Sequence, residues 1–350
     1  MTQELPPWHP DSLARRRPHL AARARLIGAL RRYFEEEGFV EVETPALQIC
    51  PGMEPHLQAF ATRLDEPFGQ GQRSLYLHTS PELAMKKLLV AGVPRLYQLA
   101  RVFRNGERAA THHPEFTMLE WYRNEADSHC LEKDCRALLV AALAASGRSE
   151  FHWNGQACDP RQPWQRLSVA EAFQRHAGLD LLATTPDPLR PDRQALAKAA
   201  AAIGIVAQPA DRWEDLFFKV FLDRIEPQLG IGAPTLLHGY PLSMAALARP
   251  DPRDPRLADR FELYVCGLEL ANAFGELTDA ALQRRRFEAD QALKQELYGT
   301  AYPIDEDFLA ALAHGLPPCS GIALGFDRLV MLASGAPRID DVLWLPVTKR

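Results

Sequence analysis

Apolar residues recur at helical spacing near the start of the chain and then give way to a strand pattern. Five of them lie about one or two helical turns apart: Leu20, Ile27, Leu30, Tyr33 and Phe34. This spacing predicts a helix that ends at Gly38. Alternation over 39–43 predicts a strand, which Pro45 ends. We therefore expect residues 1–20 to form an N-terminal extension before the first helix.

The next segment alternates strand patterns with one well-marked helix. Strands are expected at 75–77, 94–103 and 114–123, the last two around a polar loop. Ser80 is a favourable N-cap for the helix between them, because its hydroxyl can accept a hydrogen bond from a free backbone N–H. Pro81 suits the first helical position, and Gly92 suits the end.

The distribution of strands along the chain predicts the fold class. Residues from about 129 to 227 have mainly helical patterns and are expected to form an insertion. Later strands are expected at 235–240, 260–272 and 320–325, and later helices at 280–297, at 305–314 and from Asp327. Because strands cluster at both ends and do not alternate with helices, the pattern predicts an α+β fold with a mainly antiparallel sheet flanked by helices.

Composition narrows the class of protein. The 350 residues are 47% hydrophobic and carry a formal net charge of −5, which indicates a folded globular chain and disfavours one that coats nucleic acid. The six cysteines contain no Cys-x-x-Cys pair and are expected to be reduced and mostly buried. No apolar stretch reaches the ~18 residues of a membrane span, and the N-terminus lacks a secretory apolar core, so we expect a cytoplasmic protein without a membrane partner.

Common catalytic motifs are missing from the sequence. It contains no G-x-x-x-x-G-K-S/T loop, no H-E-x-x-H and no G-x-S-x-G. A nucleotide would therefore need a different binding device.

Residues 101–122 contain a carboxylate in an apolar setting. Alternation puts one set of side chains on the same strand face: Phe116, Met118, Glu120 and Tyr122. Glu120 there needs a cationic or hydrogen-bonding partner. That partner is either a core arginine or the ammonium group of a ligand. Arg104, at the end of the preceding strand, is either positioned to meet an anion or an ordinary surface charge.

Residues 260–280 contain three glutamates spaced seven apart. Glu262, Glu269 and Glu276 are the members of this series. Glu269 is expected to point inward on the strand face of Phe261, Leu263 and Val265. Convergent carboxylates suit Mg²⁺, which prefers oxygen ligands and bridges substrate phosphates. The alternative is a set of solvated acids.

Residues 320–332 join a strand of small residues to a helix. Gly321, Ala323 and Gly325 would let a flat ligand approach the backbone closely. Arg328 lies in the first helical turn, where the helix dipole disfavours a cation unless a polyanion is near. The alternative is a salt bridge with Asp327 or Glu269.

Together these segments resemble the signature motifs of class II aminoacyl-tRNA synthetases. Residues 35–47, with Pro45, are similar to motif 1, residues 101–122 to motif 2 in its lysyl form, and residues 320–332 to motif 3. Residues 79–83 and 269–279 also resemble the lysyl subgroup. Lysyl-tRNA synthetases carry an N-terminal β-barrel that reads the anticodon, and about 20 residues before the first helix are too few for one. The closer resemblance is to truncated lysyl-synthetase paralogues, the elongation factor P–lysine ligases.

This resemblance implies a reaction and its participants. Such ligases activate (R)-β-lysine with ATP and transfer the aminoacyl group to the ε-amine of a lysine on elongation factor P. They use Mg²⁺ and work as homodimers, and no tRNA partner is expected. Residues 21–350 would then be one class II catalytic domain without an anticodon-binding domain. Two alternatives remain: a stand-alone enzyme that charges tRNA with lysine, and a non-enzymatic regulatory paralogue that binds an amino acid.

The resemblance also implies roles for individual residues. The expected catalytic residues are Arg104 and Arg328. The expected substrate contacts are Ser80, Pro81, Glu82, Glu120, Tyr122, Glu276 and Ala323. The expected ATP contacts are Arg104, Asn105, Gly106, Glu107, His113, Phe116, Glu269, Leu270, Asn272, Gly325 and Arg328, with Phe116 stacking on adenine. Glu269 and Glu276 are the expected Mg²⁺ ligands.

Three positions depart from the lysyl pattern. Gly106 stands where motif 2 usually has Glu, with Glu107 one place later, and Ala273 replaces a usual Gly. The phosphate-facing Arg before Pro114 is absent, and Arg108 is an alternative source of that charge.

Overall fold

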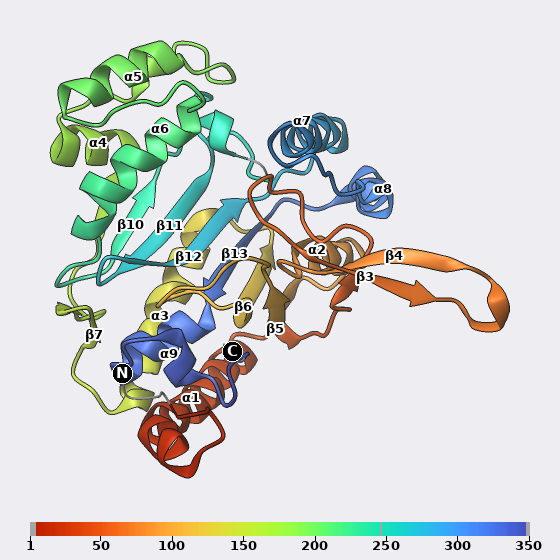
Figure 1. The fold of residues 1–350 in the computed structure, drawn as a ribbon, viewed down its shortest axis with the longest axis vertical. Helices are drawn as coiled ribbons and strands as arrows, with labels where there is room; N and C mark the ends of the chain where they lie inside the picture. Colours follow the sequence, from red (N-terminus) through yellow and green to blue (C-terminus); the bar gives the residue numbers. More distant parts are fainter. Residues whose placement is uncertain (1–4, 246, 348–350) are drawn as a thin grey trace.

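A large mixed sheet forms the centre of the computed structural model, which describes residues 5–245 and 247–347 (Figure 1). Its strand order is β1-β5-β6-β13-β12-β11-β10-β9. The strands are β1 (Val40–Glu41), β5 (Arg95–Phe103), β6 (Glu115–Asn124), β9 (Gln165–Ser168), β10 (Thr235–His238), β11 (Arg260–Val265), β12 (Leu268–Gly275) and β13 (Cys319–Gly325). Only the pairs β1–β5 and β10–β9 at the two edges are parallel in this sheet. The predicted α+β, mainly antiparallel class is confirmed.

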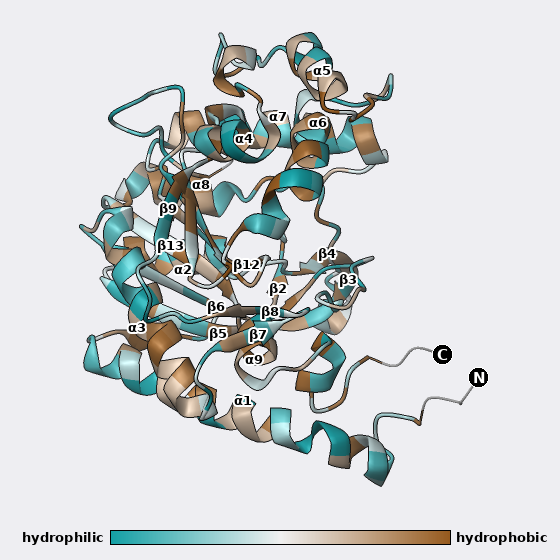
Figure 2. Ribbon diagram, turned by 90° about the vertical axis from the view of Figure 1, so that its left-hand side faces the viewer, coloured by the Kyte–Doolittle hydropathy of each residue, from teal (hydrophilic) through white to brown (hydrophobic). Residues whose placement is uncertain are grey.

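One face of the sheet is covered by three helices. They are α1 (Pro10–Glu36), α3 (Ser128–Ser146) and α9 (Phe326–Ser334). The largest apolar cluster lies between them and the sheet, where the Phe34 ring stacks on Tyr97 at 4.2 Å. In Figure 2, brown apolar segments gather where α3 and α9 meet the sheet. This helical layer packs against one face of the sheet. The opposite face is left free to form a binding site.

Helix α1 begins at Pro10, ten residues before the first apolar position that predicted it. Its early turns bury Ser12, Arg16 and Arg23. Arg16 donates to the carbonyl oxygens of Leu343 and Trp344 at 2.6 and 2.9 Å. Apolar periodicity cannot reveal a helix whose contact face is polar, which is why residues 10–19 were expected to be extension.

The segment expected to be a helical insertion divides between two cores. Helix α3 packs in the main core, whereas α4 (Val169–Ala177), α5 (Arg193–Ala202) and α6 (Trp213–Val220) build a second one with residues of β9, β10 and β11. A single π-helical turn, Phe221–Ile225, follows α6. In Figure 1 these helices lie beside β10 and β11, at one edge of the sheet.

Three more helices lie at the other end of the sheet. They are α2 (Glu82–Val90), α7 (Ala280–Tyr298) and α8 (Glu306–Gly315), which share a third apolar cluster. Helix α2 starts one residue later than expected, and Ser80 Oγ still accepts a hydrogen bond from the Glu82 backbone N–H at 3.0 Å. The remaining one-turn helices are η1 (Pro67–Gly69), η2 (Leu182–Thr184), η4 (Glu226–Gln228), η5 (Leu242–Met244) and η6 (Ile339–Val342).

A long hairpin projects from the body of the molecule. Strands β3 (Phe60–Asp65) and β4 (Gln72–Leu77) form it, and β4 also pairs with β2 (Leu47–Gln48). Figure 1 shows the hairpin reaching away from the sheet. Phe68 at its tip is 98% exposed. A separate small hairpin joins β7 (Phe151–Trp153) to β8 (Gln156–Cys158).

Two expectations from composition concern cysteines and membranes. All six cysteines are free thiols, and all but Cys130 are buried, as predicted. None of the described helices combines the length and apolar content that crossing a bilayer requires.

Candidate active site

A cavity of about 430 Å³ opens on the face of the sheet opposite α1 and α9. Among the residues predicted from sequence, it is lined by Ser80, Glu82, Arg104, Glu107, His113, Phe116, Glu269, Leu270, Asn272, Ala323, Gly325 and Arg328. The structure therefore brings together residues from all the motif-like segments after residue 79. Six predicted residues do not line it: Pro81, Asn105, Gly106, Glu120, Tyr122 and Glu276.

The predicted alternation along β6 holds. Leu119 and Trp121 point into the main core, while Phe116 and Met118 pack beside Ala323. Ala323 pairs with Glu120 in the ladder between β13 and β6, so the two side chains share a face. That face forms part of the floor of the cavity.

Glu120 lies beneath the floor and is held by two hydroxyl groups. Ser80 Oγ donates to one carboxylate oxygen at 2.7 Å, and Tyr122 Oη donates to the other at 2.5 Å. Glu120 is only 1% exposed. Burial, together with the negative charge of Glu82, raises the pKa of Glu120 to about 8. No arginine pairs with it among the described residues, so the core-arginine alternative does not apply.

Lys86 is a buried cation that sequence reasoning missed. Its Nζ lies 2.5 Å from a carboxylate oxygen of Glu82 and 2.5 Å from one of Glu276. Burial raises the pKa of Glu276 to about 7, although Lys86 opposes this. The spacing of Glu82 and Lys86, four residues apart on α2, was the signal available in the sequence. Lys86 partly neutralises an otherwise acidic end of the cavity.

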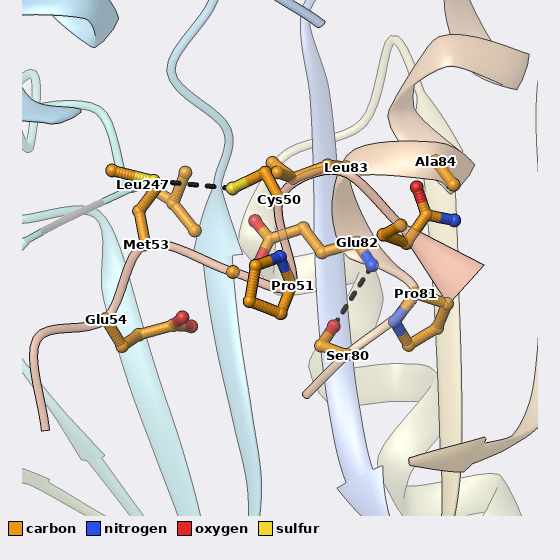
Figure 3. Close-up of a pocket in the computed structure, with 12 residues that line it drawn as sticks. Cys50, Pro51, Met53, Glu54, Ser80, Pro81, Glu82, Leu83, Ala84 and Leu247 are labelled. Atoms are coloured by element: carbon orange, nitrogen blue, oxygen red, sulfur yellow. Dashed lines mark hydrogen bonds between the residues drawn. The ribbon is translucent and has the colours of Figure 1, made fainter. Parts of the chain in front are cut away.

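Glu54 is a second missed residue at this acidic end. It lines the cavity and also a smaller adjoining pocket with Ser80 and Glu82. Figure 3 shows its carboxylate directed toward the space beside these two residues. Glu54 lies two residues after Gly52 in an irregular segment that has no helical or strand periodicity. The sequence pattern therefore gave no indication that Glu54 would face the cavity.

Arg104 stands between the acidic end and the opposite side of the cavity. Its guanidinium carbon lies 5.2 Å from the centre of the Phe116 ring. Its Nε is buried and finds no hydrogen-bond partner in the part of the chain that is described. The next residue, Asn105, uses its backbone N–H to bind the Gln58 carbonyl at 2.7 Å. A buried donor without a partner, in a residue that lines the cavity, suits an anionic ligand.

Arg328 is fixed by neighbours other than the expected carboxylates. It donates to the Glu269 carbonyl oxygen at 2.8 Å and lies 2.8 Å from His112 Nε2. Asp327 instead pairs with Arg23. Burial and the positive charge of Arg328 lower the pKa of His112, so the neutral ring accepts this hydrogen bond. The salt-bridge alternative for Arg328 is absent among the described residues, and its guanidinium remains available to an anion in the cavity.

Arg108, the alternative source of a phosphate-facing charge, does not line the cavity. Its guanidinium donates to the Val347 carbonyl oxygen at 3.1 Å, at the exposed C-terminal segment. His113, from the same loop, accepts a hydrogen bond from the Val347 N–H at 3.1 Å. Both residues thus bind the C-terminal segment, and of the two only His113 lines the cavity.

The expected orientation of Glu269 was wrong. A tight turn at Cys266 and Gly267, both with positive φ, splits residues 260–272 into β11 and β12. The ladder pairs Glu269 with Tyr264 and Asn272 with Glu262, so Glu269 shares the face of Glu262 and not that of Phe261. A hairpin reverses the chain, and periodicity counted through it assigns the wrong face.

Glu262 and Glu269 differ in their partners. Glu262 accepts hydrogen bonds from Tyr240, Tyr264 and Arg260. The Glu269 carboxylate makes no hydrogen bond or ion pair with the described residues. Burial and the charge of Glu262 raise the pKa of Glu269 to about 7. Glu262 thus forms an ion pair with Arg260, whereas the arginines that act on Glu269 form no ion pair with it in the described part of the chain.

Glu269 and Glu276, the two predicted Mg²⁺ ligands, have different charged neighbours. Glu276 interacts with Lys86, Glu82 and Arg249, whereas Glu269 interacts with Glu262 and three arginines. Across residues 5–245 and 247–347, no cluster of three or more His, Cys, Asp or Glu residues is arranged to hold a metal. Glu269 and Glu276 stay predicted Mg²⁺ ligands, and a site on either would be completed by oxygen atoms of the substrate.

Gly321 also has a different role from the one expected. A Cβ atom there would lie 2.1 Å from a ring carbon of Tyr122 and 2.5 Å from a carboxylate oxygen of Glu276. The glycine therefore makes room for these two side chains and not for a flat ligand. Gly325, at the other end of β13, does line the cavity.

Comparison with known proteins identifies the class. Residues 13–349 match the family described as tRNA synthetases class II (D, K and N). The chain therefore belongs to the class II tRNA synthetase family, and the fold predicted from its motifs is confirmed.

Similar curated proteins point to one group within this class. The chain is 42% identical over 344 residues to the elongation factor P–(R)-β-lysine ligase of Sodalis glossinidius, covering 98% of each chain. It is 40% identical over 348 residues to the Salmonella paratyphi B ligase of the same name, covering 99% of each. The Haemophilus influenzae ligase is 40% identical over 336 residues, with 96% of each covered. The chain thus falls among the elongation factor P–(R)-β-lysine ligases and is an ATP-using enzyme.

Proposed function

We propose that the protein activates (R)-β-lysine with ATP and transfers the aminoacyl group to the ε-amine of a lysine on elongation factor P. The observation that supports this most directly is the division of charge in the cavity. Arg260 and Arg328 lie around Glu269, the carboxylates around Lys86 lie at the other end, and Arg104 stands between the two. An amino acid with an additional ammonium group, joined to a nucleotide phosphate, needs both.

The arginine side of the cavity is the proposed ATP site. Phe116 offers its ring to adenine, and Arg328 approaches from the adjacent β13–α9 junction. The remaining proposed nucleotide contacts are Asn105, Gly106, Glu107, His113, Glu269, Leu270, Asn272 and Gly325, of which Asn105 and Gly106 would contribute by backbone. His112 is added to this set because it orients the Arg328 guanidinium.

Glu269 is the proposed residue for holding Mg²⁺. Its half-buried carboxylate forms no hydrogen bond or ion pair with the described residues and has a raised pKa, which fits a site completed by a cation. Mg²⁺ is commonly held by one carboxylate together with substrate phosphates. When bound, the ion would neutralise charge on the phosphates. We do not assign Glu276 to the metal, because Lys86 already pairs with it.

The acidic end is the proposed amino-acid site. Pro81 fixes the start of α2 beside this site. The residues proposed to surround the amino acid are Ser80, Glu82, Glu120, Tyr122, Glu276 and Ala323. At pH 7 the Glu120 carboxyl is largely protonated without substrate, given its pKa of about 8. A substrate ammonium group would draw it into the charged form, which favours an ion pair in this apolar surrounding.

Catalysis in this proposal is positioning and charge stabilisation. The substrate carboxylate attacks the α-phosphorus in line, and pyrophosphate leaves. Arg104 and Arg328 bind the phosphoryl oxygens on which negative charge develops. In the second step a neutral lysine amine attacks the mixed anhydride and releases AMP. Because a free lysine has a pKa near ~10.4, this amine must first lose a proton.

The assembly and the extent of the catalytic unit are also proposed. Val40, Leu47 and Ile49 are exposed apolar residues near the motif 1 segment, which supports a homodimer formed through this edge. We propose one catalytic unit over residues 21–350 that also includes α1 from Pro10, with its insertion chiefly in α4–α6. It would work in the cytoplasm, without tRNA.

Mass spectrometry of elongation factor P tests the proposal. Purified protein, ATP, Mg²⁺ and β-lysine should add one β-lysyl group to a lysine of elongation factor P, and α-lysine should be used less well. Charging of lysine tRNA without modification of elongation factor P would support the stand-alone synthetase instead. Absence of ATP–pyrophosphate exchange with every amino acid would support the regulatory alternative.

A further inference from the structure

We propose that Glu54 is a specificity-determining residue that binds the ammonium group nearest the carboxylate of the substrate. This rests on the proposed activation of a diamino acid at the acidic end of the cavity. Glu54 lies outside all the motif-like segments, and no role for it follows from them. Glu54 faces the substrate space, forms no ion pair with the described residues, and lies in a segment whose backbone is held by Lys294.

Glu54 faces the place where the substrate would lie. It lines both the main cavity and the adjoining pocket, in each case beside Ser80 and Glu82. Figure 3 shows these residues converging from the 50–54 segment and from the start of α2. A Cβ atom on Gly52 would lie 2.8 Å from the Glu54 carboxylate. The glycine therefore leaves space for the carboxylate to fold back toward the pocket.

No other residue holds the Glu54 carboxylate. Its own backbone N–H donates to it, and none of the other described residues donates a hydrogen bond to it or forms an ion pair with it, whereas Glu120 accepts two hydrogen bonds and Glu82 pairs with Lys86. Burial and the charge of Glu82 raise the pKa of Glu54. A carboxylate in this state gains most from a cation supplied by a ligand.

The surroundings of Glu54 indicate which ammonium group it would bind. Arg104 and Glu54 both line the main cavity, and the charges of Arg104, Lys86 and Lys294 act on Glu54, whereas Glu120 does not line this cavity and has Lys86 as a nearby cation. Glu54 therefore lies on the Arg104 side of Glu82, and Glu120 lies farther from Arg104. Since Arg104 is proposed to bind the phosphoryl group that the substrate carboxylate attacks, Glu54 is close to the amine next to that carboxylate. Glu120 and Tyr122 remain for the amine at the far end.

The segment that carries Glu54 is fixed from two sides. Lys294 on α7 donates to the carbonyl oxygens of Pro55 and Leu57 at 2.8 and 2.7 Å. The Ala59 N–H donates to Tyr302 Oη at 2.7 Å. These bonds place the backbone before a ligand arrives, which reduces the entropy lost on binding.

Glu54→Gln tests the proposal because it removes the charge and keeps the shape. ATP–pyrophosphate exchange is measured with β-lysine, with 3-aminohexanoate, which has only the near amine, and with 6-aminohexanoate, which has only the far amine. We expect KM to rise about tenfold to a hundredfold for the first two, the effect of losing one charge-assisted hydrogen bond. KM for 6-aminohexanoate should stay within about twofold of wild type. Glu66→Gln, next to the projecting hairpin strand β3, is the matched control. It should leave the KM values of all three compounds unchanged.

Each outcome bears on one of the two proposals. If wild-type protein is inactive with all three compounds, the proposed function fails whatever Glu54 does. If wild type is active and Glu54→Gln leaves KM for β-lysine unchanged, or raises all three values equally, the assignment of Glu54 is wrong and the function stands. If Glu54→Gln does not fold, Glu54→Asp decides. It keeps the charge but withdraws it by one methylene, so it should raise KM only for compounds with the near amine, and a uniform or absent effect would overturn the assignment.

Discussion

Lys86 and Glu276 form an ion pair of 2.5 Å in which the side chains are only 2% and 1% exposed. The same ammonium group lies 2.5 Å from Glu82. Two carboxylates from α2 and from the end of β12 therefore share one cation below the cavity. Because buried charges are costly without partners, this arrangement ties the geometry of the proposed amino-acid site to the stability of the fold.

Replacing Lys86 should destabilise the protein strongly. Lys86→Met keeps the approximate volume but leaves two buried carboxylates without their cation, and we expect a loss of about 3 kcal/mol or more. Urea unfolding followed by circular dichroism measures it. Lys198→Met, at an exposed position of α5, should cost no more than about 0.5 kcal/mol. Equal stability of the two variants would contradict this account of Lys86.

Stability should decrease as the pH rises from about 4.5 to about 7. Burial raises the pKa values of Glu269 and Glu276 from 4.5 to about 7 in the folded protein. Between these values the folded state binds more protons than the unfolded state, so the free energy of unfolding falls with rising pH. Denaturant titrations at a series of pH values test this. The variant with both Glu269→Gln and Glu276→Gln should show a flatter profile, and an unchanged slope would exclude these groups as its cause.

Binding of β-lysine should release protons at neutral pH. Burial raises the pKa of Glu120 to about 8, and an incoming ammonium group would lower it again. Affinity should therefore rise with pH up to about 8 and then level off. Isothermal titration in buffers of different ionisation enthalpy measures the protons released. Glu120→Gln should weaken β-lysine binding and reduce the number of protons released. If this variant releases as many protons as wild type, the protons come from another group.

Arg328 should matter far more than Arg108 for adenylate formation. Arg328→Ala removes a positioned guanidinium from the cavity, and we expect kcat for ATP–pyrophosphate exchange to fall about 10²- to 10³-fold. Arg328→Lys should recover little of this, because an ammonium group cannot reproduce the planar contacts to His112 and Glu269. Arg108→Ala should retain nearly full activity, since Arg108 binds the Val347 carbonyl. A large loss in that variant would restore Arg108 as a phosphate contact.

Gly321→Ala should disturb the amino-acid end without touching the nucleotide side. The added methyl group would overlap Tyr122 and Glu276, and we expect a cost of about 1–3 kcal/mol together with a higher KM for β-lysine. KM for ATP should change little. Gly28→Ala, inside α1 where the nearest atom to the new Cβ is 3.6 Å away, should instead stabilise the protein by roughly 0.5–1 kcal/mol. If both variants change the free energy of unfolding in the same direction, the steric explanation for Gly321 is wrong.

Local patterns in the sequence were sufficient for much of the fold and part of the site. Alternation along 114–123 correctly placed Glu120 and Tyr122 on the face opposite Leu119 and Trp121. The strands that cluster at both ends of the chain predicted the antiparallel class. Motif-like segments identified Arg104, Phe116 and Arg328, which the structure brings into one cavity. These features depend on neighbours along the chain, so period and spacing reveal them.

Other features depend on contacts between distant segments, and only the tertiary structure decided them. The turn at Cys266 and Gly267 placed Glu269 beside Glu262, because a hairpin restarts the alternation. The polar face of early α1 became visible only with its partners Leu343 and Trp344.

The sequence by itself determined the family, the mainly antiparallel sheet and the arginines of the nucleotide side. The tertiary structure decided how the buried carboxylates are shared. It pairs Lys86 with Glu82 and Glu276, and it leaves Glu54 and Glu269 without an ion pair among the described residues. The physical reason is that the charge state of a buried carboxyl depends on cations brought to it from elsewhere in the fold, which no local pattern records.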